Sequence, residues 1–135
     1  MRKRPFVVAA AVAVLLAVLI PLWVYLADAD ENTGERKVPV SLRTGKDLFD
    51  TNCGTCHTLY AAGTDGNFGP DLDSLLAPTG PATDASTVKA TKQRVLNAIH
   101  KGVDSSTPGR MPAGILAGEQ ADQVAEFVAS EAGKG

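Results

Sequence analysis

The stretch Cys53-Gly54-Thr55-Cys56-His57 is the most informative part of this 135-residue chain. Two cysteines separated by two residues, with a histidine directly after the second, are typical of a c-type haem attachment site. Each thiol forms a thioether with one vinyl group of the haem, and the spacing places the two sulfurs about one helical turn apart. The histidine can then give an imidazole nitrogen to the iron as the proximal ligand. We therefore predict that Cys53 and Cys56 hold one covalent haem c and that His57 binds its iron.

Three other interpretations of this pentapeptide compete with haem attachment. A thiol–disulfide redox motif is expected beside a strand that leads into a helix, and no such pattern surrounds it. A zinc site needs four ligands, whereas the chain has only two cysteines and two histidines, and His100 lacks the usual zinc-finger spacing. A structural disulfide or a chance match is the third interpretation, and the motifs further along the chain disfavour it.

Charge is distributed unevenly along the chain. The first 27 residues contain only Arg2, Lys3 and Arg4, and the remainder carries ten basic and 15 acidic residues, a net charge of −5. An acidic domain without a basic patch argues against nucleic acid as a partner. Aromatic residues are scarce, at 5%, so a buried porphyrin would add apolar volume that the side chains do not supply.

The N-terminal segment, residues 6–27, contains no charge and consists mostly of Val, Ala and Leu. As a helix, about 22 residues span roughly 33 Å, near the hydrocarbon thickness of a bilayer. This pattern predicts a single N-terminal transmembrane helix that contacts membrane lipid through residues 6–27. Because basic residues precede it and acidic residues follow it, we expect a cytoplasmic N-terminus and a haem domain on the extracytoplasmic face of the plasma membrane. The alternative is a signal peptide cleaved near Ala29.

The chain is expected to have three parts. Residues 1–27 hold the basic cluster and the apolar segment. Residues 28–42 are polar and show no helical or strand period, which predicts a flexible linker with an r.m.s. span of about 20 Å. Residues 43–135 form the globular domain.

Four short helices are expected in the globular domain, at residues 44–50, 72–76, 87–101 and 118–132. Thr44 and Asp71 are placed to cap the first two helices. The last two carry apolar stripes with a 3.6-residue period, and they stop before Gly102 and Gly133, which suit the position just past a helix. The loop at residues 77–86 receives no role from this pattern.

Met111 is the only methionine besides Met1, and it precedes Pro112 in a polar loop. A lone thioether in such a loop is an unusual core residue, so we expect Met111 to be the distal ligand of the haem iron. His100 is the other candidate. Ile99 lies on the apolar stripe of its helix, however, which turns His100 toward the surface.

The ordered set of motifs resembles that of a class I cytochrome c. The set consists of Cys53-Gly54-Thr55-Cys56-His57, Gly69-Pro70-Asp71-Leu72, Met111-Pro112 and an amphipathic final helix, and it covers about residues 43–132. The resemblance implies an all-α fold wrapped around one haem, with the first and last helices crossing near the attachment site. The residues expected at that crossing are Gly45, Phe49, Val124, Phe127 and Val128.

The resemblance also implies the roles of Gly69 and Pro70, which would bind the cofactor on its histidine side. The Pro70 carbonyl would accept a hydrogen bond from the second ring nitrogen of His57, which fixes the tautomer and raises the basicity of the ligand. With His57 and Met111 on the two faces of the iron, no coordination position stays open for a substrate.

The function expected from this coordination is one-electron transport rather than enzymatic catalysis. We expect a carrier in a membrane respiratory or photosynthetic chain, with a quinol-oxidising complex as donor and a terminal oxidase or other redox protein as acceptor. One alternative is a fixed haem c subunit of a larger oxidoreductase complex. Another is a haem enzyme or gas sensor in which the bond from Met111 is labile.

Overall fold

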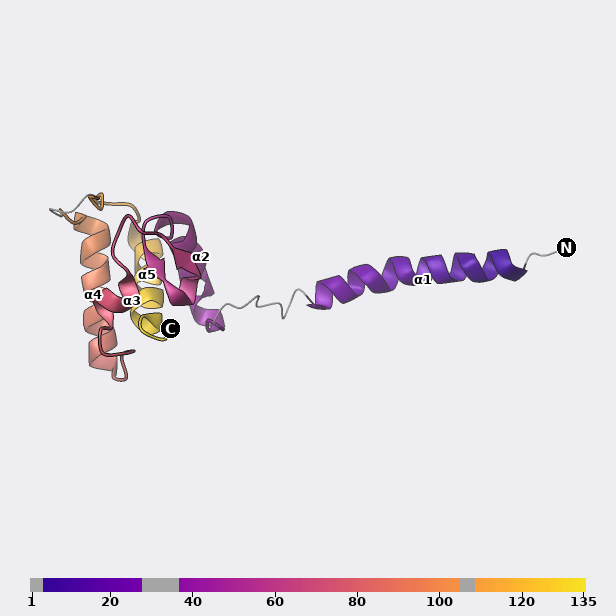
Figure 1. Ribbon diagram of the computed structural model, residues 1–135, viewed down its shortest axis with the longest axis horizontal. Coiled ribbons are helices and arrows are strands. Elements are labelled where there is room, and N and C mark those ends of the chain that lie inside the picture. Colours follow the sequence, from indigo (N-terminus) through magenta and orange to yellow (C-terminus); the bar gives the residue numbers. More distant parts are fainter. Residues whose placement is uncertain (1–3, 28–36, 105–108) are drawn as a thin grey trace. The chain divides into compact units, whose positions relative to one another are not determined.

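The computed structural model describes residues 4–27, 37–104 and 109–135. The chain divides into two units, residues 1–33 and 34–135. Helix α1 (Arg4–Ala27) belongs to the first unit, and every other helix and strand belongs to the second (Figure 1). Most of the predicted linker, residues 28–36, lies outside the described residues, and the predicted boundaries after residues 27 and 42 stay predictions.

Helix α1 differs from the transmembrane helix that the sequence predicts. Among the residues that the structure describes, no helix combines the length and the apolar character that crossing a membrane requires. This finding contradicts the predicted transmembrane helix and the plasma-membrane location inferred from it, and both are withdrawn. The lipid contact predicted for residues 6–27 loses its basis with them.

The second unit is mostly helical. Its described helices are α2 (Arg43–Asn52), α3 (Leu72–Leu76), α4 (Ala85–Lys101) and α5 (Gly118–Glu131), with 3₁₀ turns η1 (Val40–Leu42) and η2 (Tyr60–Ala62). Two short antiparallel strands, β1 (Thr58–Leu59) and β2 (Thr64–Asp65), pair Leu59 with Thr64. All four predicted helices of the domain are present. The hairpin was not predicted, because a two-residue strand is too short to show an alternating pattern.

The start of α2 differs from the prediction. The 3₁₀ turn η1 runs directly into the helix, so Leu42 is the N-cap residue and it makes no capping side-chain bond. Thr44 therefore lies inside the first turn, and its predicted capping role is wrong. A 3₁₀ turn at a helix end satisfies part of the backbone itself, which removes the need for a side-chain cap.

Aspartates cap the next two helices. The Asp71 carboxylate accepts hydrogen bonds from the backbone N–H groups of Asp73 and Ser74, which confirms its predicted role at the start of α3. Asp84 accepts from the N–H of Thr87 in the same way, so α4 begins two residues earlier than predicted. Each cap satisfies donors that have no partner within the helix.

Helices α2 and α5 cross at Gly45. A Cβ on Gly45 would lie 2.2 Å from the carbonyl oxygen of Gln123 and 2.8 Å from the Cβ of Phe127, so only glycine permits this approach. Next to it, Phe49 and Phe127 pack edge to face with ring centroids 5.9 Å apart. Both rings are at most 1% exposed. The predicted crossing of the first and last helices is confirmed.

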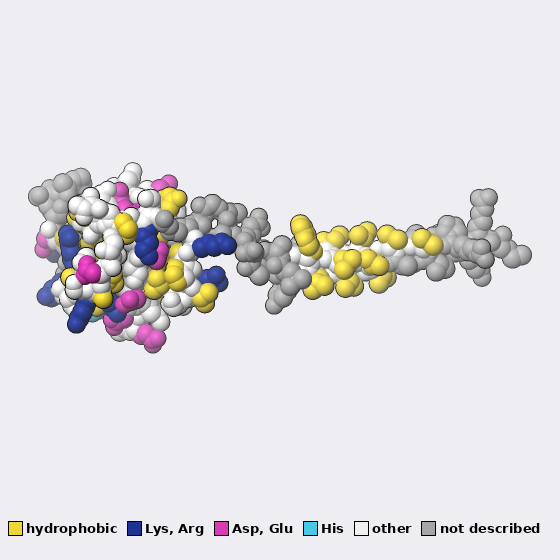
Figure 2. All heavy atoms as spheres, turned by 90° about the horizontal axis from the view of Figure 1, so that it is seen from below, with side chains coloured by type: hydrophobic (Ala, Val, Ile, Leu, Met, Phe, Trp, Pro, Cys, Tyr) yellow, Lys and Arg dark blue, Asp and Glu magenta, His cyan; other side chains and the backbone are white. Residues whose placement is uncertain are grey.

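Helix α4 packs along α5 and closes the core from the other side (Figure 1). Ile99 is its buried residue, and the Lys92 amine lies 3.0 Å from Glu126 and 3.4 Å from Asp122 on α5. Val38, from the segment predicted as linker, is 8% exposed and also packs into the core. Acidic and basic side chains are interspersed on the face of this unit seen in Figure 2.

Candidate functional site

The pentapeptide of residues 53–57 connects the end of α2 to β1. The backbone N–H groups of Cys56 and His57 both donate to the carbonyl of Cys53, at 3.0 and 2.9 Å, which folds the segment into a tight turn. Cys53 is buried, Cys56 is exposed, and neither forms a disulfide. Burial, together with the neighbouring Cys56, raises the pKa of the Cys53 thiol to about 11. The polypeptide therefore presents Cys53 as a neutral thiol at neutral pH.

The ring of His57 is held by the loop that follows β2. Its Nδ1 lies 3.0 Å from the carbonyl oxygen of Pro70, which is the hydrogen bond expected from the sequence. A carbonyl oxygen can only accept, so Nδ1 carries a proton that it donates to Pro70, and Nε2 is the ring nitrogen on the opposite side. Gly69 lies against the ring, since a Cβ there would be 2.5 Å from Cε1 of His57. The hydrogen bond and the close packing of Gly69 together orient the imidazole.

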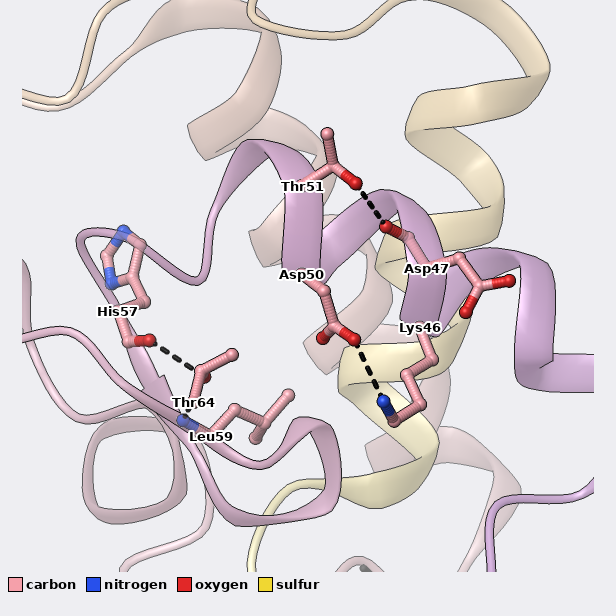
Figure 3. A network of polar contacts seen from close by, with 7 residues as sticks. All are labelled: Lys46, Asp47, Asp50, Thr51, His57, Leu59 and Thr64. Carbon is pink, nitrogen blue, oxygen red and sulfur yellow. Dashed lines mark hydrogen bonds and ion pairs between the residues drawn. The ribbon is translucent and has the colours of Figure 1, made fainter. Parts of the chain in front are cut away.

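The backbone on both sides of His57 is also held. The Thr64 hydroxyl donates to the carbonyl of His57 at 2.9 Å and accepts from the N–H of Leu59 at 3.1 Å (Figure 3). The N–H of Gly69 donates to the carbonyl of Cys56 at 2.7 Å. Sequence reasoning missed Thr64, because it lies in the short hairpin and because a single threonine carries no distinctive signal.

Met111 comes from a different segment, the loop between α4 and α5. Its backbone exchanges two hydrogen bonds with Val103, at 3.0 and 3.2 Å, and its half-buried side chain packs against the apolar core. It lines a cavity of about 410 Å³. The other residues that line this cavity are Lys101, Val103, Asp104, Arg110, Pro112 and Ala113.

The two loops that carry the predicted site residues meet at Gly109 and Phe68. A Cβ on Gly109 would lie 2.7 Å from the carbonyl oxygen of Phe68, one residue before Gly69. The structure therefore brings the histidine-side loop against the loop of Met111. His100, in the last turn of α4, is exposed, as expected for a surface histidine.

These side chains fit a covalently attached porphyrin. The donor set contains two thiols in one tight turn, an imidazole whose Nδ1 donates to a backbone carbonyl, and a thioether beside a cavity that none of the other three donors lines. Imidazole and thioether are the axial pair that c-type haem iron takes, and thiols are the groups that form its covalent links. Because Gly69 has no side chain, the backbone of the loop can lie directly against the His57 ring.

Comparison with known proteins agrees with this chemistry. The family model for cytochrome c matches residues 42–131. Photosystem II extrinsic protein V of Guillardia theta is 36% identical over 81 residues, which cover 51% of this chain and 48% of that protein. The chain thus spans about half the length of this curated relative. Because the family match extends over most of the chain, the protein belongs to the cytochrome c family and carries a covalently attached haem c.

Proposed function

We propose that this protein is a one-electron carrier whose own side chains fill both axial positions of the haem iron. In this proposal the two cysteines hold the haem, one histidine and one methionine bind the iron, and two loop residues shape the histidine side. The residues assigned to these roles are Cys53, Cys56, His57, Met111, Gly69 and Pro70.

The observation that carries the proposal is the 3.0 Å contact between Nδ1 of His57 and the carbonyl oxygen of Pro70. A hydrogen bond of this kind raises the basicity of the opposite ring nitrogen and fixes the ring orientation, as partners of ligating histidines do in other metal sites. It supports a permanent axial ligand, because the hydrogen bond restrains the ring in one orientation. An ordinary surface histidine does not need this restraint.

When bound, the haem supplies an iron that alternates between the ferrous and ferric states. The chain would provide the same ligands, held by the same hydrogen bonds, in both oxidation states. Pro70 holds the His57 proton on Nδ1, so no proton needs to move when the charge changes. The thioether of Met111 disfavours the extra charge of ferric iron and raises the reduction potential. With His57 and Met111 both bound to the iron, a substrate or oxygen would have no coordination position, which supports a carrier rather than an enzyme.

The proposal also names an electron donor and an electron acceptor. A carrier with a raised potential suits a quinol-oxidising complex as donor and a terminal oxidase or other redox protein as acceptor, in a respiratory or photosynthetic chain. Stopped-flow mixing with each purified complex tests this assignment. We expect rapid reduction by the donor and rapid oxidation by the acceptor, and a protein that exchanges electrons with neither contradicts it.

The axial assignment is tested by substitution of Met111. The ferric parent protein should show the weak sulfur-to-iron charge-transfer band in its absorption spectrum, and Met111→Ala should remove it. Pro112→Ala is the matched control, because it changes the same loop and keeps the thioether. A band that persists in Met111→Ala shows that another group ligates the iron.

A second candidate function is a fixed haem subunit of a larger assembly. The specific observation in its favour is the 36% identity to a protein named as an extrinsic protein of photosystem II. Gentle extraction followed by size-exclusion chromatography distinguishes the two. Co-purification with other polypeptides in a constant ratio favours the subunit, whereas a haem protein that elutes by itself favours the carrier.

A further inference from the structure

We propose that Thr64 is a positioning residue for the haem ligand His57 and that it acts through the main chain. This inference rests on the proposed ligation of the iron by His57. Among the described residues, Thr64 makes no hydrogen bond with a predicted ligand side chain. Its hydroxyl instead lies 2.9 Å from the carbonyl oxygen of His57, and its place is the second strand of the hairpin that follows the haem pentapeptide (Figure 3).

The hydroxyl of Thr64 both donates and accepts a hydrogen bond within the hairpin. A hydroxyl has one hydrogen to donate, and the carbonyl of His57 receives it. The oxygen accepts the N–H of Leu59 at 3.1 Å, across the same hairpin. Because Leu59 is fully buried, this second bond connects the hydroxyl to the rigid core. Thr64 therefore holds the backbone of His57 in place relative to the core.

The two backbone bonds around His57 fix its torsion angles. The carbonyl of Cys56 belongs to the peptide plane before His57 and is held by the N–H of Gly69 at 2.7 Å. The carbonyl of His57 belongs to the plane after it and is held by Thr64. Since φ and ψ are the only soft backbone angles between two planar peptides, anchoring both planes fixes the direction in which the imidazole leaves the chain.

The methyl group of Thr64 has a separate contact with the pentapeptide. A Cβ on Gly54 would lie 2.5 Å from Cγ2 of Thr64, so the methyl packs directly on the Gly54 backbone. Hydroxyl and methyl can be separated by substitution. Thr64→Val keeps the shape and removes the hydrogen bonds, whereas Thr64→Ser keeps the hydrogen bonds and removes the methyl.

Thr58 provides a matched control in the partner strand. Its hydroxyl donates to the carbonyl of Gly66 at 2.9 Å, the same length as the bond from Thr64 to His57. Thr58→Val therefore removes a similar hydrogen bond from the same hairpin and leaves the carbonyl of His57 untouched. An effect of general hairpin stability appears in both valine variants, whereas a positioning effect appears only at Thr64.

The experiment uses the full-length, haem-loaded chain and compares the parent with the three variants. Ferric EPR spectra and midpoint potentials report the ligand orientation, and denaturant unfolding reports stability. We expect both valine variants to lose stability to a similar degree. Only Thr64→Val should broaden the EPR signal and shift the midpoint potential, and Thr64→Ser should restore the parental EPR spectrum and potential.

Two results overturn the inference alone, given a parent with the EPR signature of imidazole-ligated iron. One is a parental spectrum and potential in Thr64→Val, and the other is an equal change in Thr58→Val. If Thr64→Val does not fold, Thr64→Ala decides, because it also removes the hydroxyl, and a parental spectrum and potential there contradict the inference. A parent without the imidazole signature overturns the proposed ligation by His57 first and this inference with it.

Discussion

The ring of His57 lies directly against the backbone of Gly69. A Cβ on Gly69 would be 2.5 Å from Cε1 and 2.6 Å from Nδ1 of that ring, distances at which the ring or the loop must move. The next residue, Pro70, accepts the hydrogen bond from the same ring. One short loop therefore sets both the position and the protonation pattern of the proposed ligand.

We expect Gly69→Ala to displace the His57 ring and to weaken its bond to Pro70. The ferric absorption and EPR spectra should change, because the ring no longer meets the iron at its native angle. Asn67→Ala, an exposed change in the same loop, is the control and should leave the spectra as they are. Native spectra in Gly69→Ala would show that the loop does not position the ligand.

The approach of Gly45 to Phe127 leads to a second prediction. Because a Cβ on Gly45 would lie 2.2 Å from a backbone oxygen of α5, Gly45→Ala must push the two helices apart. Overpacking of this kind costs about 1–3 kcal/mol, more than the helix propensity gained from alanine. Guanidinium unfolding measures the loss, and the exposed neighbouring change Thr44→Ala should cost far less. A Gly45→Ala protein as stable as the parent contradicts the observed crossing.

The cap of α3 predicts a pH-dependent stability. Hydrogen bonds, first of all from the Ser74 hydroxyl, lower the pKa of the Asp71 carboxyl below its ordinary value of 3.8. A lowered folded-state pKa means that the stabilisation is complete above pH 3.8 and is lost as the pH falls through the lowered value. We expect Asp71→Ala to cost about 1 kcal/mol at neutral pH and progressively less in acid.

Unfolding of Asp71→Ala and Asp71→Asn over a range of pH tests this prediction. Asparagine still accepts the capping hydrogen bonds but does not titrate, so Asp71→Asn should stay near the parental stability at neutral pH. An Asp71→Ala deficit that is the same at neutral pH and below pH 3.8 would show that the carboxylate charge plays no part in the cap.

Much of the domain could be predicted because its signals are local and repeated. The apolar stripe of α5 recurs over several turns, so its buried face follows from periodicity, whereas its crossing with α2 was implied by the resemblance to class I cytochrome c. Asp71 was identifiable as a cap from its own side-chain chemistry and its place before an apolar turn. The hydrogen bond between His57 and Pro70 was implied by the resemblance to class I cytochrome c.

Other features depend on contacts that no short pattern reveals. Thr64 acts on His57 through a hairpin whose strands are two residues long, too short for a readable period. Thr44 does not cap α2, because the 3₁₀ turn η1 runs directly into that helix. No sequence pattern marks the turn. The transmembrane prediction counted apolar residues along residues 6–27, whereas no helix among the described residues meets the requirement for spanning a membrane.

The central claim is that Cys53 and Cys56 together hold one haem, and intact-mass analysis of the purified full-length protein tests it most directly. The account predicts a mass that exceeds that of the polypeptide by one haem and survives denaturation. A variant with Cys53→Ala and Cys56→Ala should show the bare polypeptide mass. A parent protein found at the bare mass, or a double variant that retains the added mass, would contradict the claim.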